Sequence, residues 1–207
     1  MHRLQSAILD GNSALSSALA EEALDGGVSP QELLAILIEA MEKVGEEYER
    51  GERFVPEMLV AADAMKAAMV SLRPRLQEAG IRPRGRVVLG TVDGDLHDIG
   101  KNLVGVMLEG AGFEVIDLGV EVSSERFVGA VREYRPEILA LSALLTTTMI
   151  HMPEVIEALR SAGLRGGVQV MIGGAPVTQE YAERIGADGY ADDAPSAVAL
   201  AKRLVGE

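Results

Sequence analysis

His97 is the residue of this sequence with the clearest potential for metal chemistry. It lies in the polar, glycine-containing segment 93–100, DGDLHDIG. A metal-bound imidazole normally donates its second ring N–H to a carboxylate, and Asp95, two residues earlier, is the natural acceptor. A hydroxyl from segment 142–148 would be placed to orient Asp95 in turn. Because a lone histidine is more often structural, this hypothesis depends on where the fold places the segment.

The same segment also admits a second kind of site. Asp93, Asp95 and Asp98 could form an acidic pocket for a divalent cation, as in the phosphoryl chemistry of receiver-like domains. Cysteine is absent, which excludes disulfides, thiolate metal sites and cysteine nucleophiles.

Short apolar runs alternating with amphipathic segments must position these residues. The runs predict strands at 86–92, 114–119, 137–143, 168–174 and 188–191. The segments between and after them predict helices at about 100–111, 123–134, 148–162, 178–186 and 194–205. Strands that alternate with helices form parallel βαβ units on one open sheet. We therefore predict a doubly wound, five-stranded parallel domain, Rossmann-like or flavodoxin-like, over residues 82–207.

In such sheets, ligands bind beyond the carboxyl ends of the strands. Segment 93–100 follows the first predicted strand, segment 142–148 the third, and segment 173–176 the fourth. We expect these three loops to meet at one edge of the sheet, with His97 among them.

Residues 1–81 have a different pattern, with apolar residues three and four positions apart. They predict helices at about 3–10, 13–25, 30–50 and 55–79. Ser29-Pro30-Gln31-Glu32 is a well-formed helix start, with an N-cap serine and a glutamate three residues later. We expect a small four-helix bundle, joined to the α/β domain by the Pro-, Gly- and Arg-rich linker 82–86.

The composition of the chain bears on which classes of partner it can bind. The formal net charge is −13, aromatic residues make up 3% and tryptophan is absent. Nucleic-acid binding relies on basic faces and stacking rings, so we expect no nucleic-acid partner. The first ten residues lack the apolar core of a signal peptide, and no apolar run approaches the roughly 20 residues that span a bilayer. We therefore expect a cytoplasmic protein with no membrane partner.

Three short motifs together resemble a known signature. Asp95-x-His97-x-x-Gly100, then Ser142-x-Leu144, then Gly173-Gly174 resemble the cobalamin-binding signature of the base-off/His-on family. That family includes the cobalamin module of methionine synthase and the small corrinoid proteins of methyltransferase systems. The 41 residues between the first two motifs and the 28 between the last two also match its spacing.

The resemblance implies a role for each matching residue. His97 resembles the lower axial ligand that replaces the cofactor's own base on cobalt. Asp95 resembles its hydrogen-bond partner, and Thr148 matches the hydroxyl position that completes this relay. Methionine synthase has serine at that position, and threonine keeps the hydroxyl.

Other residues are similar to the cofactor's surroundings in this family. Ser142 and Leu144 resemble walls of the pocket for the displaced nucleotide tail. Gly173 and Gly174 resemble the place where backbone approaches that tail closely, although an ordinary turn after a strand would also explain them. The remaining residues that the resemblance places around cobalamin are Asp93, Gly94, Asp98, Ile99, Gly100 and Thr146.

The helical part resembles the cap that covers the upper face of the corrin in this family. Phe54 resembles the cap residue that packs near the methyl group, but a hydrophobic staple at a helix start is an equal alternative. Met58, Met65 and Met69 are better explained as core residues than as cobalt ligands.

The resemblance implies a corrinoid protein that carries a methyl group and is itself non-catalytic. Its expected partners are a substrate-specific corrinoid methyltransferase, an acceptor methyltransferase acting on tetrahydrofolate or a thiol, and a reductive activase. Two alternatives share the module: the cobalamin-binding subunit of an isomerase, and a cobalamin-dependent sensor. Such isomerases normally need a large barrel, and such sensors add a basic DNA-binding domain, whereas residues 1–80 are acidic.

Overall fold

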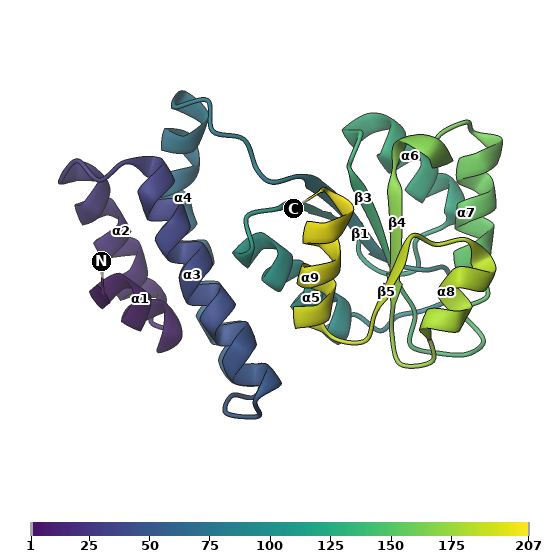
Figure 1. Cartoon of the computed structure of the whole chain (residues 1–207), viewed down its shortest axis with the longest axis horizontal. Helices are drawn as coiled ribbons and strands as arrows, with labels where there is room; N and C mark the ends of the chain where they lie inside the picture. Colours follow the sequence, from purple (N-terminus) through teal and green to yellow (C-terminus); the bar gives the residue numbers. More distant parts are fainter. Residues whose placement is uncertain (1, 207) are drawn as a thin grey trace. The chain divides into compact units, whose positions relative to one another are not determined.

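The chain consists of a helical part followed by an α/β part (Figure 1). The structure is a computed structural model and describes residues 2–206. Contacts between residues divide it into two compact units, residues 2–83 with 109–112, and residues 84–108 with 113–206. The division after Pro83 lies close to the boundary expected after residue 81. Whether either unit folds alone stays a prediction.

The helical unit contains the four predicted helices: α1 (His2–Leu9), α2 (Ser13–Asp25), α3 (Pro30–Glu49) and α4 (Val55–Glu78). Helix α4 packs against α2 and α3, and α1 packs against the same two helices. The start of α3 is a capping box, in which the Ser29 hydroxyl accepts from the Glu32 N–H and the Glu32 carboxylate accepts from the Ser29 N–H. Met58 and Met65 are buried, as expected for core residues, and Met69 is half-buried.

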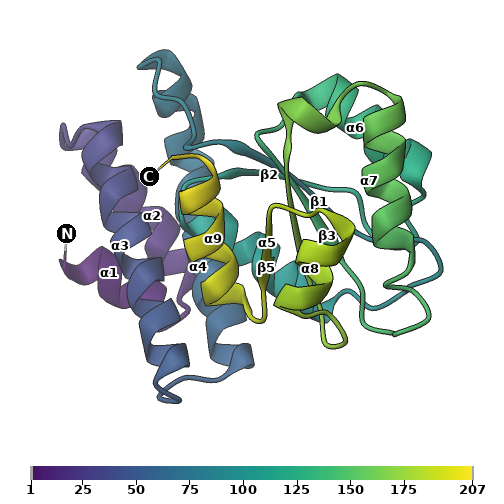
Figure 2. The same cartoon turned by 45° about the vertical axis from the view of Figure 1, so that its right-hand side comes forward.

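The α/β unit is a parallel five-stranded sheet in the order β2-β1-β3-β4-β5. Its strands are β1 (Arg86–Thr91), β2 (Glu114–Asp117), β3 (Ile138–Ser142), β4 (Gln169–Gly173) and β5 (Gly189–Ala191). Its helices are α5 (Ile99–Gly110), α6 (Ser124–Tyr134), α7 (His151–Ser161), α8 (Gln179–Ile185) and α9 (Ala194–Leu204), with a short 3₁₀ turn η1 (Arg165–Gly167). Helices α5 and α9 cover one face and α6, α7 and α8 the other (Figures 1 and 2), which confirms the predicted doubly wound fold.

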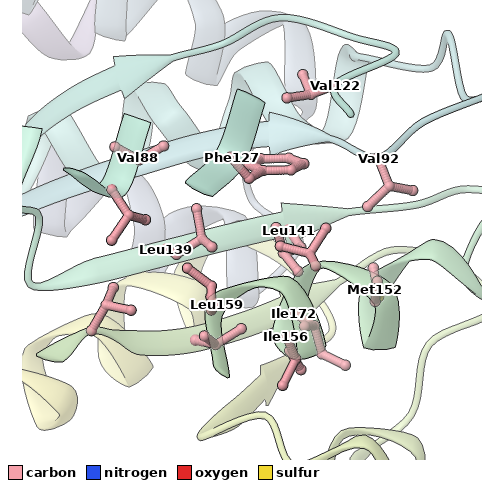
Figure 3. Packing of buried hydrophobic residues seen from close by; sticks show 14 of the residues in the cluster. Val88, Val92, Val122, Phe127, Leu139, Leu141, Met152, Ile156, Leu159 and Ile172 are labelled. Atoms are coloured by element: carbon pink, nitrogen blue, oxygen red, sulfur yellow. The ribbon is translucent and has the colours of Figure 1, made fainter. Parts of the chain in front are cut away.

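A continuous apolar core fills the space between the sheet and helices α6 to α8. Phe127 of α6 lies over β1, while Leu139 and Leu141 of β3 face Ile156 and Leu159 of α7 (Figure 3). All five side chains are buried. Burial on both faces explains why the central residues of β1 and β3 are apolar in succession rather than alternating.

The predicted elements differ from the observed ones mainly at their ends. Each observed strand is shorter by one or two residues, because pairing stops where the chain turns out of the sheet. Helix α7 begins at His151, not at 148, and residues 146–150 form turns instead. Thr148, expected in the first turn of that helix, therefore lies in the loop before it. No helix within residues 2–206 is both long enough and apolar enough to cross a membrane.

Candidate functional site

The strand register aligns the loops that carry the candidate residues. Thr91 at the end of β1 lies beside Ser142 at the end of β3, and Ser142 lies beside Gly173 at the end of β4. The loops that follow these strands therefore start from neighbouring points at the carboxyl edge of the sheet, where open α/β sheets bind ligands.

Asp95 is the centre of a hydrogen-bond network at this edge. Its Oδ1 accepts from the His97 ring Nδ1 at 2.7 Å and from the His97 backbone N–H at 3.0 Å. Its Oδ2 accepts from the Thr148 hydroxyl at 2.6 Å and from the Leu144 backbone N–H at 2.8 Å. The structure thus brings together His97, Asp95 and Thr148, the three residues predicted to form a relay.

The Asp95 side chain is completely buried, yet it is held as a carboxylate. Burial alone would raise its pKa, but the hydrogen bonds from Thr148, Leu144 and His97 together outweigh burial and hold the pKa far below its usual range. An ionised carboxylate only accepts hydrogen bonds, so the hydrogen between the two side chains belongs to His97 Nδ1. In the neutral ring, this leaves the lone pair on Nε2.

His97 keeps Nε2 as its one polar group without an internal hydrogen bond among those described. Nδ1 and the backbone N–H both donate to Asp95, and the backbone carbonyl accepts from the Thr91 hydroxyl at 3.0 Å. The side chain is nevertheless 51% exposed. Such a ring is pre-oriented and accessible, as a metal ligand must be.

Large apolar side chains are exposed to solvent in the two loops that Asp95 joins. Leu96 and Ile99, on either side of His97 in the sequence, are 66% and 74% exposed. Leu144 and Leu145 in the neighbouring loop are also exposed. Exposed apolar side chains gathered at a ligand edge mark a surface that a broad, largely apolar molecule would cover.

This donor set fits a metal that arrives with equatorial ligands of its own. Within residues 2–206, no three histidine, aspartate or glutamate side chains are arranged to hold a free ion. Asp93 and Asp98 are exposed while Asp95 is committed to its four donors, so the acidic pocket considered for a divalent cation does not form. A single oriented imidazole beside apolar side chains suits a cobalt corrin instead.

Gly173 and Gly174 are explained by the packing of the protein itself. A Cβ on Gly174 would lie 1.9 Å from the carbonyl oxygen of Ala143, and its φ is +124°. A Cβ on Gly173 would lie 2.9 Å from the carbonyl oxygen of Ala191. Gly174 thus approaches the loop after β3, and Gly173 approaches its pairing partner in β5, so both positions leave little room for a side chain. Their predicted contact with a nucleotide tail stays a prediction.

The other candidate residues differ in how far they are exposed. Ser142 is half-buried at the end of β3, and Gly94, Gly100 and Thr146 are exposed in the predicted loops. Phe54 precedes α4, where its N–H donates to the Glu57 carboxylate at 2.8 Å. Its side chain is 68% exposed, so the hydrophobic-staple alternative is wrong.

Two structural contributions were not foreseen from the sequence. The Leu144 backbone N–H holds Asp95, and no side-chain pattern encodes a backbone donor. Thr91 is fully buried and its hydroxyl holds the His97 carbonyl. A hydroxyl at the end of the apolar run RVVLGT was a possible signal for this contact.

Comparison with known proteins gives a consistent result. Residues 85–199 match a family described as B12 binding domain, and residues 1–73 match a second family with the same description. A corrinoid protein of Desulfitobacterium hafniense is 40% identical over 100% of this chain and 98% of its own length. Trimethylamine corrinoid protein 1 of Methanosarcina mazei is 43% identical over 97% of this chain and 94% of its own.

Solved structures agree in fold. The methanol:cobalamin methyltransferase complex MtaBC of Methanosarcina barkeri contains a chain that matches with a TM-score of 0.87 and 30% identity, over 98% of this chain and 78% of that chain. A cobalamin-binding protein of Desulfitobacterium hafniense matches with a TM-score of 0.81 and 37% identity, over 99% of this chain and 98% of that chain.

Proposed function

Since this chain belongs to the family of B12-binding domain proteins, we propose that it holds cobalamin base-off, through His97, and carries a methyl group between two methyltransferases. The observation that carries the proposal is the His97–Asp95–Thr148 network. It orients one imidazole through Nδ1 and leaves Nε2 without an internal hydrogen bond, on a ring that is half exposed.

In this proposal, the corrinoid supplies a cobalt centre that takes up a methyl group and gives it to an acceptor. The chain supplies the surroundings. His97 would hold the cobalt through Nε2, and Asp95 would keep the ring in one tautomer and orientation. The apolar side chains of Leu96 and Ile99 would exclude water beside the imidazole. Ser142, Leu144 and the Gly173-Gly174 turn would border the nucleotide tail.

We propose that Phe54 would contact the cofactor, because its side chain is exposed and the residue before it is held by hydrogen bonds. Arg53, the preceding residue, donates to the Glu47 carboxylate at 2.9 Å and to the Leu9 carbonyl at 2.8 Å. These bonds tie the loop between α3 and α4 to α3 itself and to the last residue of α1. An exposed ring on a loop that is already held in place loses less conformational freedom on binding a ligand than a ring on a mobile loop.

The proposed partners are a substrate-specific corrinoid methyltransferase, an acceptor methyltransferase and a reductive activase. Relatives named as trimethylamine and dimethylamine corrinoid proteins, at 43% and 46% identity, support this kind of system. The structural match within a methanol:cobalamin methyltransferase complex supports direct pairing with a methyltransferase. Methylated amines are therefore the first donors to test.

Reconstitution tests the proposal. The purified protein is incubated with methylcobalamin and desalted, and its absorbance spectrum is recorded. We expect a corrin retained on each chain, with a spectrum in which histidine has replaced the benzimidazole base. Addition of a thiol and an acceptor methyltransferase from a methylamine system should then yield the methyl thioether. Loss of the corrin on desalting, or retention without any methyl transfer, would contradict the proposal.

A further inference from the structure

The main chain of His97 is held at both its N–H and its carbonyl. The ring and the backbone N–H share one acceptor, Asp95 Oδ1. The backbone carbonyl has a different partner, the Thr91 hydroxyl at 3.0 Å. The loop from Val92 to Asp98 contains no helix or strand, so such contacts determine where His97 lies.

Thr91 is a rigid donor. Its backbone N–H donates to the Gly119 carbonyl and its own carbonyl accepts from the Val122 N–H, both at 3.0 Å. It pairs with Ser142 across β1 and β3, and its side chain is fully buried. A buried hydroxyl needs a hydrogen-bond partner, and the His97 carbonyl is that partner.

We propose that Thr91 is a positioning residue for the cobalt ligand: its hydroxyl anchors the carbonyl end of the His97 main chain to the end of β1, in addition to the bonds by which Asp95 holds the ring and the backbone N–H. The inference rests on the proposed function, because it presupposes that His97 binds cobalt. It adds a residue outside the Asp-x-His motif. Asp95 of the motif sets the tautomer and rotation of the imidazole and holds the His97 N–H, and Thr91 holds the carbonyl of the same residue.

The test compares three variants in the full-length protein loaded with cobalamin. Thr91→Val removes the hydroxyl at nearly constant volume, and Thr91→Ser keeps it. Thr147→Val makes the same chemical change at an exposed threonine in the neighbouring loop. Nitrogen coupling in the Co(II) electron paramagnetic resonance spectrum of ¹⁵N-histidine protein reports the fraction of cobalt bound to histidine. Thermal unfolding of the cofactor-free protein reports stability separately.

Thr91→Val should retain the corrin, while the equilibrium between histidine-bound and histidine-free cobalt shifts toward the free form by roughly 2- to 12-fold, the effect of one neutral hydrogen bond. Thr91→Ser should restore the wild-type fraction, and Thr147→Val should leave it unchanged. An unchanged histidine-bound fraction in Thr91→Val would overturn the inference, even if unfolding shifts, because the hydroxyl would then be merely structural.

Two further outcomes are also decisive. If Thr91→Val does not fold, Thr91→Ala is judged by the same fraction, and a wild-type value in it overturns the inference. If the wild-type protein itself shows no histidine coupling, the proposed function fails, and Thr91 has no ligand to position. Wild-type coupling with no Thr91 effect, in contrast, contradicts this inference alone.

Discussion

At the scale of single residues, the buried charge of Asp95 is the feature that needs a physical account. A carboxylate removed from water without partners costs several kcal/mol. Asp95 has no lysine or arginine beside it among the described contacts. Four donors from His97, Thr148 and Leu144 compensate the charge instead. A residue stabilised in this way is also a fixed acceptor, which is what an orienting partner for a metal ligand has to be.

Asp95→Asn should reduce the free energy of unfolding of the cofactor-free protein by about 1.5–3 kcal/mol at neutral pH, the value of a charge-assisted hydrogen bond. The folded-state pKa of Asp95 is depressed. Its stabilisation is therefore complete above the unfolded pKa of about 3.9 and is lost as the pH falls toward the folded value. Urea unfolding at neutral pH and at about pH 3 measures the free energy of unfolding of the variant and of the wild type. The difference between the two should be smaller at pH 3.

The matched control is Asp93→Asn, the same change at an exposed carboxylate two residues earlier. It should leave the free energy of unfolding almost unchanged at both pH values. A deficit in Asp95→Asn that stays constant with pH would contradict the ionised, hydrogen-bonded state assigned to Asp95.

The contacts of the site that join two side chains could be predicted from the sequence, whereas those that involve the backbone could not. The spacing of Asp95 and His97 and the presence of a hydroxyl in a loop at the same edge predicted the contacts that the structure shows. The contribution of Leu144 could not be predicted, because any residue supplies a backbone N–H. The contact of Thr91 depends on how the loop folds back over β1, which local sequence does not encode.

At the scale of elements, the carboxyl ends of β3 and β4 approach each other closely because Gly174 has no side chain. All five strands and their parallel arrangement followed from the alternation of apolar runs and amphipathic segments. The exact ends did not, because the chain leaves the sheet wherever a loop finds better partners. Thr148 shows this: its hydroxyl donates to Asp95, and α7 begins three residues later.

Gly174→Ala should lower the free energy of unfolding by about 2–5 kcal/mol, since a left-handed backbone and a clash act together. The added Cβ would lie 1.9 Å from the Ala143 carbonyl oxygen, so the loop after β4 must move away from β3. Gly129→Ala, in α6, meets nothing within 4 Å and should stabilise the helix by about 0.5–1 kcal/mol. Urea unfolding compares the two variants. Equal effects would show that the close approach at Gly174 is unimportant.

At the scale of the whole molecule, each unit has its own buried interior. The helical unit buries Leu33, Leu37 and Met41 along α3, and the α/β unit buries the cluster around Phe127. The change in sequence pattern near residue 82 lies close to the division between these two units after Pro83. The formal net charge of −13 leads us to expect no nucleic-acid partner, because phosphate backbones are bound by basic faces.

A fragment of residues 82–207 should fold alone and retain cobalamin, because it contains the whole sheet and the His97 network. Circular dichroism and a cooperative thermal transition measure its folding, and absorbance after desalting measures its retained corrin. Removal of the helical unit, which carries Phe54, should speed photolysis of bound methylcobalamin. The full-length protein is the control. An unfolded fragment would show that the proposed two-domain division is wrong.

Ligation of cobalt by His97 is the central claim, and nitrogen coupling in the Co(II) electron paramagnetic resonance spectrum tests it most directly. The protein is labelled with ¹⁵N-histidine, loaded with cobalamin and reduced to Co(II). His151→Ala is a matched control, because the His151 Nδ1 lies 2.7 Å from the Glu154 carboxylate and so has a carboxylate partner of its own. We predict histidine coupling in the wild type and in His151→Ala, and its loss in His97→Ala. Histidine coupling that persists in His97→Ala would contradict the account.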